Sequence, residues 1–196
     1  MNELPVDLLR KVVKYVPETG QLVWAERDAS CYPNAQTPEI AAQRATTFNK
    51  MYAGLPVTVR RNANKTRYVY LRFISQVANI SADRLLWLAI SGDLTDHVLY
   101  YKDGNVENTK LDNIILTHPL AKQALLDPTT GIKQYKAKDE TLYRALIYKN
   151  ADVPRCIKSA FKTAADAYNW RVEYLKAHNA FWSVNATDAY ESNPYK

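Results

Sequence analysis

The chain contains little cysteine and histidine, and these shortages exclude several classes of protein. Its two cysteines, Cys31 and Cys156, show neither Cys-x-x-Cys nor Cys/His spacing. This pattern argues against a disulfide framework or a structural zinc site, and two unpaired thiols are expected. Imidazole chemistry is limited to three histidines, His97, His118 and His178.

Long hydrophobic runs are also missing. No apolar stretch approaches the roughly 18 residues that a membrane-spanning helix needs. The first residues, MNELPVDLLRKVVKYV, show the pattern of an amphipathic helix rather than of a signal peptide. We therefore expect no membrane partner and a protein that stays in the cytoplasm where it is made. Its length fits one domain or two small ones.

Positive charge is present in excess and is unevenly distributed. The formal net charge is +6, and residues 131–180 contain ten Lys or Arg against five acidic residues. A second basic group has no acidic residue within it and comprises Lys50, Arg60, Arg61, Lys65, Arg67 and Arg72. Both groups suit contact with phosphates. Charge alone is equally compatible with a solvated basic surface.

The N-terminal part is predicted to contain one helix and one strand. Pro5 is a suitable first helical residue, and apolar residues at helical spacing continue to Val16 before residues 17–20 end the segment. A strand over residues 21–25 and a polar loop over residues 26–47 are expected to follow.

A basic β-hairpin is predicted next. Residues 57–61 and 67–73 alternate apolar and polar side chains on either side of a polar turn. Arg60, Arg67 and Arg72 are expected on the outer surface of this hairpin. Its candidates for contact with nucleic acid are Arg60, Arg61, Arg67 and Arg72.

A helix is expected after the hairpin, between Ser81 as its N-cap and Gly92 as its C-terminal stop.

This helix leads into SGDLTDHVLYYKDGNVENTKLDNIIL, residues 91–116. This stretch resembles, without a gap, the core of phage HNH homing-type endonucleases. There a Gly-acidic turn leads into a strand ending Asp-His, a second turn, and a helix closing on Asn-Leu, which implies a ββα scaffold.

The reactive residues of that family are replaced in this chain. In HNH enzymes the His of the Asp-His pair is the base, while the Asp and a final Asn or His bind magnesium. Here the pair reads Tyr100-Tyr101. A phenol with a pKa of about 10 accepts a proton poorly at neutral pH and is a poor metal ligand. The resemblance therefore implies a degenerate site with no catalytic residue.

An alternative site uses a literal Asp-His pair, Asp96-His97, four residues upstream. Using it would move both side chains by more than about 10 Å along a strand that rises about 3.3 Å per residue. We interpret His97 as coincidental. An active nuclease with a displaced magnesium site at Asp96, His97, Asp103 and Asn113 is kept as an alternative, since Asn113 occupies the final ligand position of the motif.

The remaining residues are predicted to form a linker, a second small domain and a tail. Residues 119–130 are interpreted as the linker. Residues 132–137, 142–149 and 155–161 are predicted as three strands, and a helix with Thr163 as N-cap follows. Residues 181–196 are polar and are predicted to be an extended or mobile tail.

Three strands and a helix, with the pattern Phe161, Thr163, Ala167 at their junction, resemble the APETALA2-type DNA-binding domain that is often fused behind phage HNH cores. In that family the sheet face away from the helix contacts DNA through Arg, Lys and aromatic side chains. Ala145 and Ile147 are then expected to face the helix. The DNA-binding candidates are Arg144 and Tyr148 by alternation, with Lys133, Tyr135, Arg155 and Lys158 as neighbours whose facing is left open.

Together these patterns predict an α+β protein. Its divisions are a degenerate HNH-like domain over residues 1–118, a linker over 119–130, an APETALA2-like domain over 131–180 and a tail over 181–196. The predicted function is that of a phage-derived, catalytically inactive protein that binds double-stranded DNA in the host cytoplasm or the virion and needs no cofactor. One alternative is an inherited fold that now contacts a virion protein or a host enzyme, which the 14 tyrosines would suit. The further alternative is the magnesium-dependent nuclease.

Overall fold

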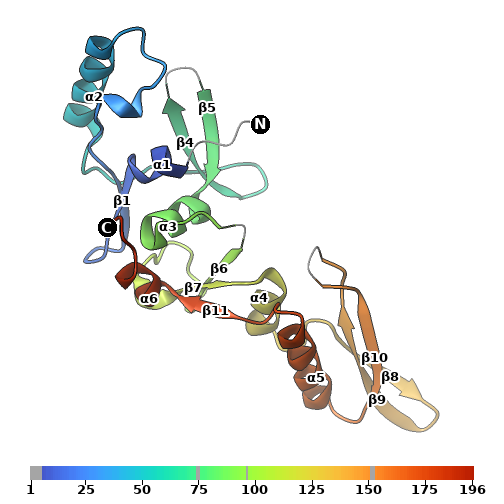
Figure 1. The fold of residues 1–196 in the computed structure, drawn as a ribbon. Coiled ribbons are helices and arrows are strands. Elements are labelled where there is room, and N and C mark those ends of the chain that lie inside the picture. Colours follow the sequence, from blue (N-terminus) through green and yellow to red (C-terminus); the bar gives the residue numbers. More distant parts are fainter. Residues whose placement is uncertain (1–5, 74–75, 96, 151–152) are drawn as a thin grey trace. The chain divides into compact units, whose positions relative to one another are not determined.

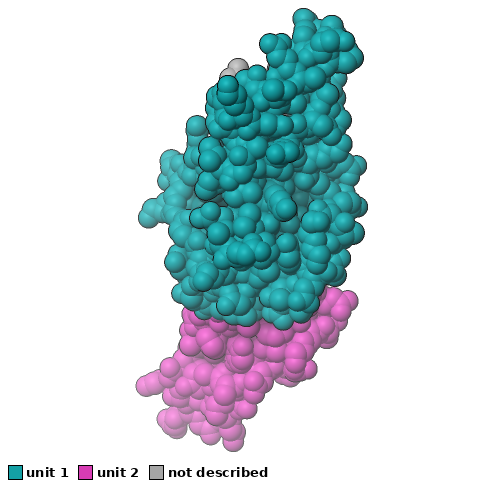
Figure 2. Space-filling view, turned by 90° about the vertical axis from the view of Figure 1, so that its left-hand side faces the viewer, with its two compact units in different colours: residues 1–96, 101–115, 185–196 teal, residues 97–100, 116–184 magenta. Residues whose placement is uncertain are grey.

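The computed structural model describes residues 6–73, 76–95, 97–150 and 153–196, without the side chains of residues 72, 73 and 76–78. It is an α+β protein with several small antiparallel sheets. The chain divides into two compact units (Figure 2). Unit 1 comprises residues 1–96, 101–115 and 185–196, and unit 2 comprises residues 97–100 and 116–184. None of the helices in the described ranges combines the length and apolarity that a membrane crossing requires.

The first helix is shorter than its sequence pattern predicted. Helix α1 covers only Val6–Arg10, and the chain then forms strand β1, Val13–Val16. This strand pairs antiparallel with β2, Gln21–Trp24, which confirms the second predicted element. The prediction of a helix reaching Val16 was wrong because β-branched valines favour a strand, where alternate side chains enter the core. Pro5 lies outside the described residues.

A long helix occupies the segment that was predicted to be a polar loop. A short 3₁₀ turn, η1, covers Ala29–Cys31, and helix α2 covers Pro38–Tyr52. The Thr37 hydroxyl accepts a hydrogen bond from the Ile40 amide at 3.3 Å, and proline stands in the first turn. The helix was missed because its buried residues are small alanines, which leave no conspicuous apolar stripe.

The predicted basic hairpin forms and gains a third strand. Strands β3, Val59–Arg61, and β4, Arg67–Phe73, pair antiparallel as expected. Strand β5, Gln76–Ser81, pairs with the other edge of β4 and was not predicted. Val69 of β4 is fully buried, so this sheet covers part of the unit 1 core.

Helix α3, Ala82–Ser91, forms the centre of unit 1. It begins after Ser81 and ends at Gly92 as predicted, although the Ser81 side chain makes no capping hydrogen bond. Gly92 adopts a left-handed backbone with φ of 84°, which favours glycine. The core that α3 joins includes the buried side chains of Leu9, Val12, Val69, Leu71, Leu85 and Leu88.

The described residues of the stretch that resembles the nuclease motif form two strands and, apart from Ser91 at the end of α3, no α-helix. Strand β6 covers Val98–Tyr101, a 3₁₀ turn η2 covers Leu111–Asn113, and strand β7 covers Ile114–Thr117. β7 lies between β6 and β11, Ser183–Asn185. The helix closing on Asn-Leu that the resemblance implied for this stretch was therefore wrong, because the β-branched residues of β7 extend the chain directly after the turn.

The helix of this region follows β7, where a linker was predicted. Helix α4 covers Pro119–Leu126. Its N-cap is His118, whose Nδ1 accepts a hydrogen bond from the Leu120 amide at 3.2 Å. Pro119 starts the helix, since proline is tolerated in the first turn, rather than interrupting structure. The order strand, strand, helix is thus present, with its helix C-terminal to the predicted place.

The sheet of unit 2 agrees with the sequence prediction. Strands β8, Ile132–Ala137, β9, Glu140–Ile147, and β10, Cys156–Phe161, form an antiparallel sheet with β9 in the centre. Helix α5, Ala164–Ala177, packs on one face of this sheet (Figure 1). The Thr163 hydroxyl accepts a hydrogen bond from the Asp166 amide at 3.0 Å, which confirms the predicted N-cap.

The last residues are ordered and belong to unit 1, so the prediction of a mobile tail was wrong. Helix α6 covers Ala186–Glu191 and packs against α3. Beyond it, the buried Asn193 amide donates to the Ile90 carbonyl oxygen at 2.9 Å. This segment was missed because it is held by alanines and one asparagine, which resemble a polar tail in sequence.

Candidate nucleic-acid interface

The face of the unit 2 sheet opposite α5, termed the outer face, gathers a mixed set of exposed and half-buried side chains. Residues that pair across strands share a face of a sheet. Ala145 and Ile147 are buried against the α5 side, as predicted. Their neighbours along β9 therefore point to the other side. With their cross-strand partners, the outer face carries Lys133, Tyr135, Leu142, Arg144, Leu146 and Ile157.

Two cationic side chains of this face lie directly opposite each other on neighbouring strands. Lys133 of β8 pairs with Arg144 of β9. The Arg144 guanidinium carbon lies 4.5 Å from the centre of the Tyr135 ring. The Tyr135 hydroxyl accepts a hydrogen bond from the Ala160 amide at 2.9 Å, so this ring reaches across β9 to β10. The guanidinium is therefore supported by a ring that is itself held at both ends.

Two further candidates, Tyr148 and Arg155, and one acidic residue, Glu140, lie at the edges of the outer face. Tyr148, immediately after β9, is 58% exposed, and Arg155 is exposed directly before β10. Glu140, at the start of β9, shares the parity of Arg144 and adds one negative charge at the far end of this face. Positive charge is thus concentrated toward Lys133 and Arg144.

Lys158, a DNA-binding candidate whose facing the sequence left open, lies on the α5 side of the sheet and not on the outer face. It pairs with Ala145, which faces α5. Its ammonium nitrogen is 5.4 Å from the centre of the Trp170 ring of α5. The register of β10 shifts between Lys158 and Phe161, and such a bulge is not evident from sequence alternation.

The arginines of the unit 1 hairpin fall into two groups. Arg60 and Arg61 are exposed, and Arg61 forms an ion pair with Glu107 at 2.5 Å. Arg67 was expected on the outer surface, but only 11% of its side chain is exposed and its Nη1 donates to the Val106 carbonyl oxygen at 2.7 Å. The side chain of Arg72 lies outside the described residues.

Tyr101 occupies the expected position of the catalytic base and is buried. Its hydroxyl donates to Asp83 Oδ1 at 3.0 Å and accepts a hydrogen bond from Arg67 Nη1 at 3.4 Å. Burial, reinforced by the negative charge of Asp83, raises the pKa of Tyr101 well above its usual value. The hydroxyl is therefore protonated at neutral pH and already bonded on both sides. Tyr100, its neighbour on β6, is half-buried.

The turn after β6 is closed by hydrogen bonds among its own side chains. Asp103 Oδ1 accepts from the Asn105 amide at 2.8 Å and from Asn113 Nδ2 at 2.9 Å. Asp103 Oδ2 accepts from Asn108 Nδ2 at 2.7 Å. These bonds, led by that from Asn108, lower the pKa of Asp103. Asn113 is buried, and its Oδ1 accepts from the Asp103 amide. Asp103 and Asn113, two residues of the displaced magnesium site considered above, thus stabilise the turn.

The other two residues of the displaced magnesium site are His97 and Asp96. His97 packs edge-on against Trp182 with ring centres 4.5 Å apart, and it lies 6.1 Å from the ring of the buried His118. Asp96 lies outside the described residues. In the part of the chain that the structure describes, no three or more His, Cys, Asp or Glu side chains form a group that could hold a metal ion.

The chain gives no match to protein-family models, to curated proteins or to solved structures. Its candidate site therefore stands on geometry. That geometry also adds residues that the sequence argument did not select, namely Leu142, Leu146 and Ile157 of the outer face. Strand alternation from Arg144 and Arg155 was the signal that could have identified them.

Proposed function

We propose that the protein binds double-stranded DNA through the outer face of unit 2 and does not cleave it. The observation that carries this proposal is the cross-strand pair of Lys133 and Arg144 beside Tyr135. An antiparallel β-ribbon fits the major groove of DNA, where arginine can bond to guanine edges and lysine to phosphates. The resemblance to an APETALA2-type domain supports the same use of this face.

The Arg144 guanidinium is held in place by the Tyr135 ring, which favours recognition of DNA bases over a diffuse attraction between charges. Arg144 rests on the ring of Tyr135, and that ring is tied to the backbone of Ala160. A side chain that is already oriented loses less conformational entropy on binding. Arg144 is therefore assigned to base contact, and Lys133 and Arg155 to phosphate contact.

The salt dependence of duplex binding tests this assignment. Neutralising about two phosphates by Lys133 and Arg155 predicts that affinity falls about 12-fold between about 50 and 200 mM salt. Removing one of these cations with Lys133→Ala should reduce this fall to about 3.5-fold. Lys136→Ala is the matched control, because Lys136 lies on the same strand but on the α5 side of the sheet. Equal effects of the two variants would contradict the proposal.

Loss of cleavage is supported by the protonated, doubly bonded hydroxyl of Tyr101. Such a group cannot take a proton from water. We expect no nicking of supercoiled plasmid with magnesium or manganese, and duplex binding that does not require either ion. Nicking that disappears in a His97→Ala variant would support the displaced-site nuclease instead.

A protein partner is the second candidate, because apolar side chains share the outer face with the cations. Ile157 is 48% exposed, and Tyr148 at the edge of this face is 58% exposed. Exposed aromatic and aliphatic groups of this kind are common in protein interfaces. Absence of duplex binding at low salt, together with a co-purifying protein that is lost in Ile157→Asp, would favour this candidate.

A further inference from the structure

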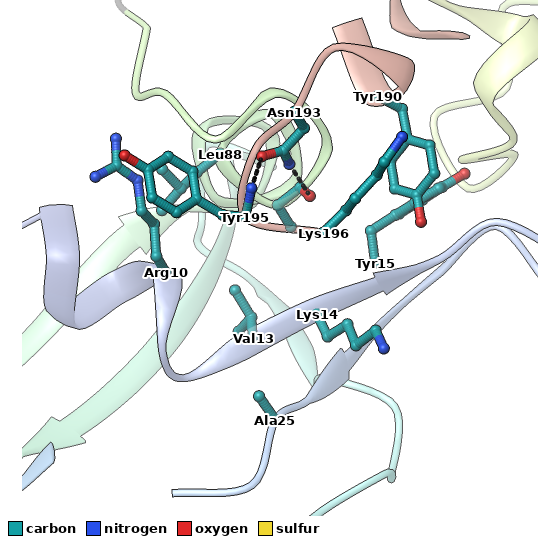
Figure 3. Close-up of a pocket in the computed structure, with 11 residues that line it drawn as sticks. Arg10, Val13, Lys14, Tyr15, Ala25, Leu88, Tyr190, Asn193, Tyr195 and Lys196 are labelled. Atoms are coloured by element: carbon teal, nitrogen blue, oxygen red, sulfur yellow. Dashed lines mark hydrogen bonds between the residues drawn. The ribbon is translucent and has the colours of Figure 1, made fainter.

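Unit 1 contains a cavity of about 220 Å³ that is remote in sequence from the proposed DNA contacts (Figure 3). Residues of β1 and Ala25 lie along one side in this view, and the residues that follow α6 lie along the other. Its apolar lining comes from Val13, Ala25 and Leu88, with Ala89 beside them. The cavity thus has an apolar interior.

The walls of this cavity are fixed by contacts within the protein. The Tyr195 amide donates to Asn193 Oδ1 at 2.8 Å, and the Asn193 side chain is anchored to the Ile90 carbonyl oxygen. The Arg10 guanidinium carbon lies 4.2 Å from the centre of the Tyr195 ring. Tyr195 is therefore held from both sides although it is exposed.

A second aromatic wall is equally well supported. Tyr15 and Tyr190 meet edge to face with ring centres 5.8 Å apart. The Tyr15 hydroxyl donates to the Thr109 carbonyl oxygen at 2.7 Å, so the position of this ring is fixed by a contact outside the cavity. Aromatic walls of this kind favour a flat ring as a ligand.

The charged residues around the cavity are all basic. Arg10, Lys14 and Lys196 line it, and among the described residues no Asp or Glu side chain does. Arg10 is occupied, since its guanidinium bonds to Asp7, Asp93 and the Gly92 carbonyl oxygen. The ammonium of Lys196 donates to the Glu191 carbonyl oxygen and retains donor capacity. Lys14 projects from β1 between buried neighbours and is exposed.

We propose that this cavity binds a small organic anion that carries one planar ring. An apolar cavity of about 150 Å³ is sufficient for benzene. The volume here therefore accommodates a ring together with one anionic group. The ring would lie between the tyrosine walls, and the anion would meet the ammonium groups of Lys14 and Lys196, where charge-assisted hydrogen bonds are strong.

Calorimetric titration of the full chain with three matched ligands tests the proposal. Phenyl phosphate and benzoate carry the same ring with different anionic groups, and benzyl alcohol is neutral. We expect saturable binding of at least one anion at one site per chain, and at least about tenfold weaker binding of benzyl alcohol, as for the loss of a charged hydrogen bond. The preferred anion would identify phosphate or carboxylate as the natural group.

Two variants connect this binding to the cavity. Lys14→Gln should weaken the anion about tenfold, whereas Lys11→Gln, which removes an exposed lysine that bonds to Ser30, should have no effect. Ala25→Leu fills the apolar interior and should abolish binding while circular dichroism stays unchanged. Absence of saturable binding of either anion at millimolar concentration would overturn the proposal, as would equal affinity for benzyl alcohol or undiminished binding by Lys14→Gln.

Discussion

Replacing Tyr101, the last residue of β6, with phenylalanine removes one buried hydroxyl and keeps the buried ring. The hydroxyl donates to Asp83 Oδ1 at 3.0 Å and accepts from Arg67 Nη1 at 3.4 Å. Only 4% of Tyr101 is exposed, so water cannot easily replace these bonds. The variant therefore isolates the contribution of the network that links β6, β4 and α3.

The expected loss follows from the charge and exposure of the partners. A hydrogen bond to a charged group contributes about 1.5–3 kcal/mol. The Asp83 side chain is 39% exposed, so water recovers part of the lost interaction. Arg67 still donates to the Val106 carbonyl oxygen at 2.7 Å and is not left unpaired. We expect Tyr101→Phe to lower the free energy of unfolding by ~1–2 kcal/mol.

Urea unfolding of Tyr101→Phe, Asp83→Ala and the double variant measures this energy and its coupling. The sum of the stability losses in the two single variants should exceed the loss in the double variant by at least about 0.5 kcal/mol, because the two residues are in direct contact. Tyr100→Phe is the control on the same strand and is expected to leave stability unchanged. A neutral Tyr101→Phe, or strictly additive losses, would refute the assignment of this hydroxyl to a stabilising network.

Three further outcomes are expected. Burial raises the pKa of Tyr15 in the folded protein to about 12. Its contribution to the free energy of unfolding is therefore complete below pH 10, where the unfolded phenol titrates, and falls by ~2 kcal/mol as the pH reaches 12. In urea unfolding, Tyr15→Phe should lose less stability than the unmodified protein as the pH rises, and an equal loss would contradict this. Gly92→Ala should lower the free energy of unfolding by more than the ~1–3 kcal/mol of backbone strain alone, because its Cβ would meet Asn193 Oδ1 at 2.8 Å. Gly54→Ala is the control, since Gly54 has a similar φ and open space around it. Equal losses of stability in the two variants would contradict a steric clash with the C-terminal segment. Ala145→Phe should destabilise unit 2 by ~1–3 kcal/mol through overpacking against α5, and an unchanged melting temperature would contradict close packing there.

Local patterns predicted those elements whose own residues decide their structure. The strands and helix of unit 2 were found because alternation and the Thr163 cap are properties of adjacent residues. The hairpin of β3 and β4 and the end of α3 at Gly92 were found for the same reason. Elements with small or polar contacts, such as α2 and α6, gave too weak a pattern.

The candidate site was predictable in residue type but not in facing. Alternation correctly placed Arg144 and Ala145 on opposite faces of the sheet, since both lie in one regular strand. The facing of Lys158 was left open, and its ammonium lies beside Trp170. Arg67 was expected on the outer surface of the hairpin, yet it bonds to the Val106 carbonyl oxygen. A bulge and a distant loop determine these positions, and neither has a local signal.

The sequence by itself determined the α+β class and the basic character of unit 2, and it placed Tyr100-Tyr101 where the resemblance expects an Asp-His pair, because these depend on composition and short-range pattern. Only the tertiary structure decided that Tyr101 is bonded to Asp83 and that Asn193 anchors the last residues to Ile90. Such contacts join residues far apart in the chain. Their stability comes from burial and from mutual satisfaction of polar groups, which no single segment encodes.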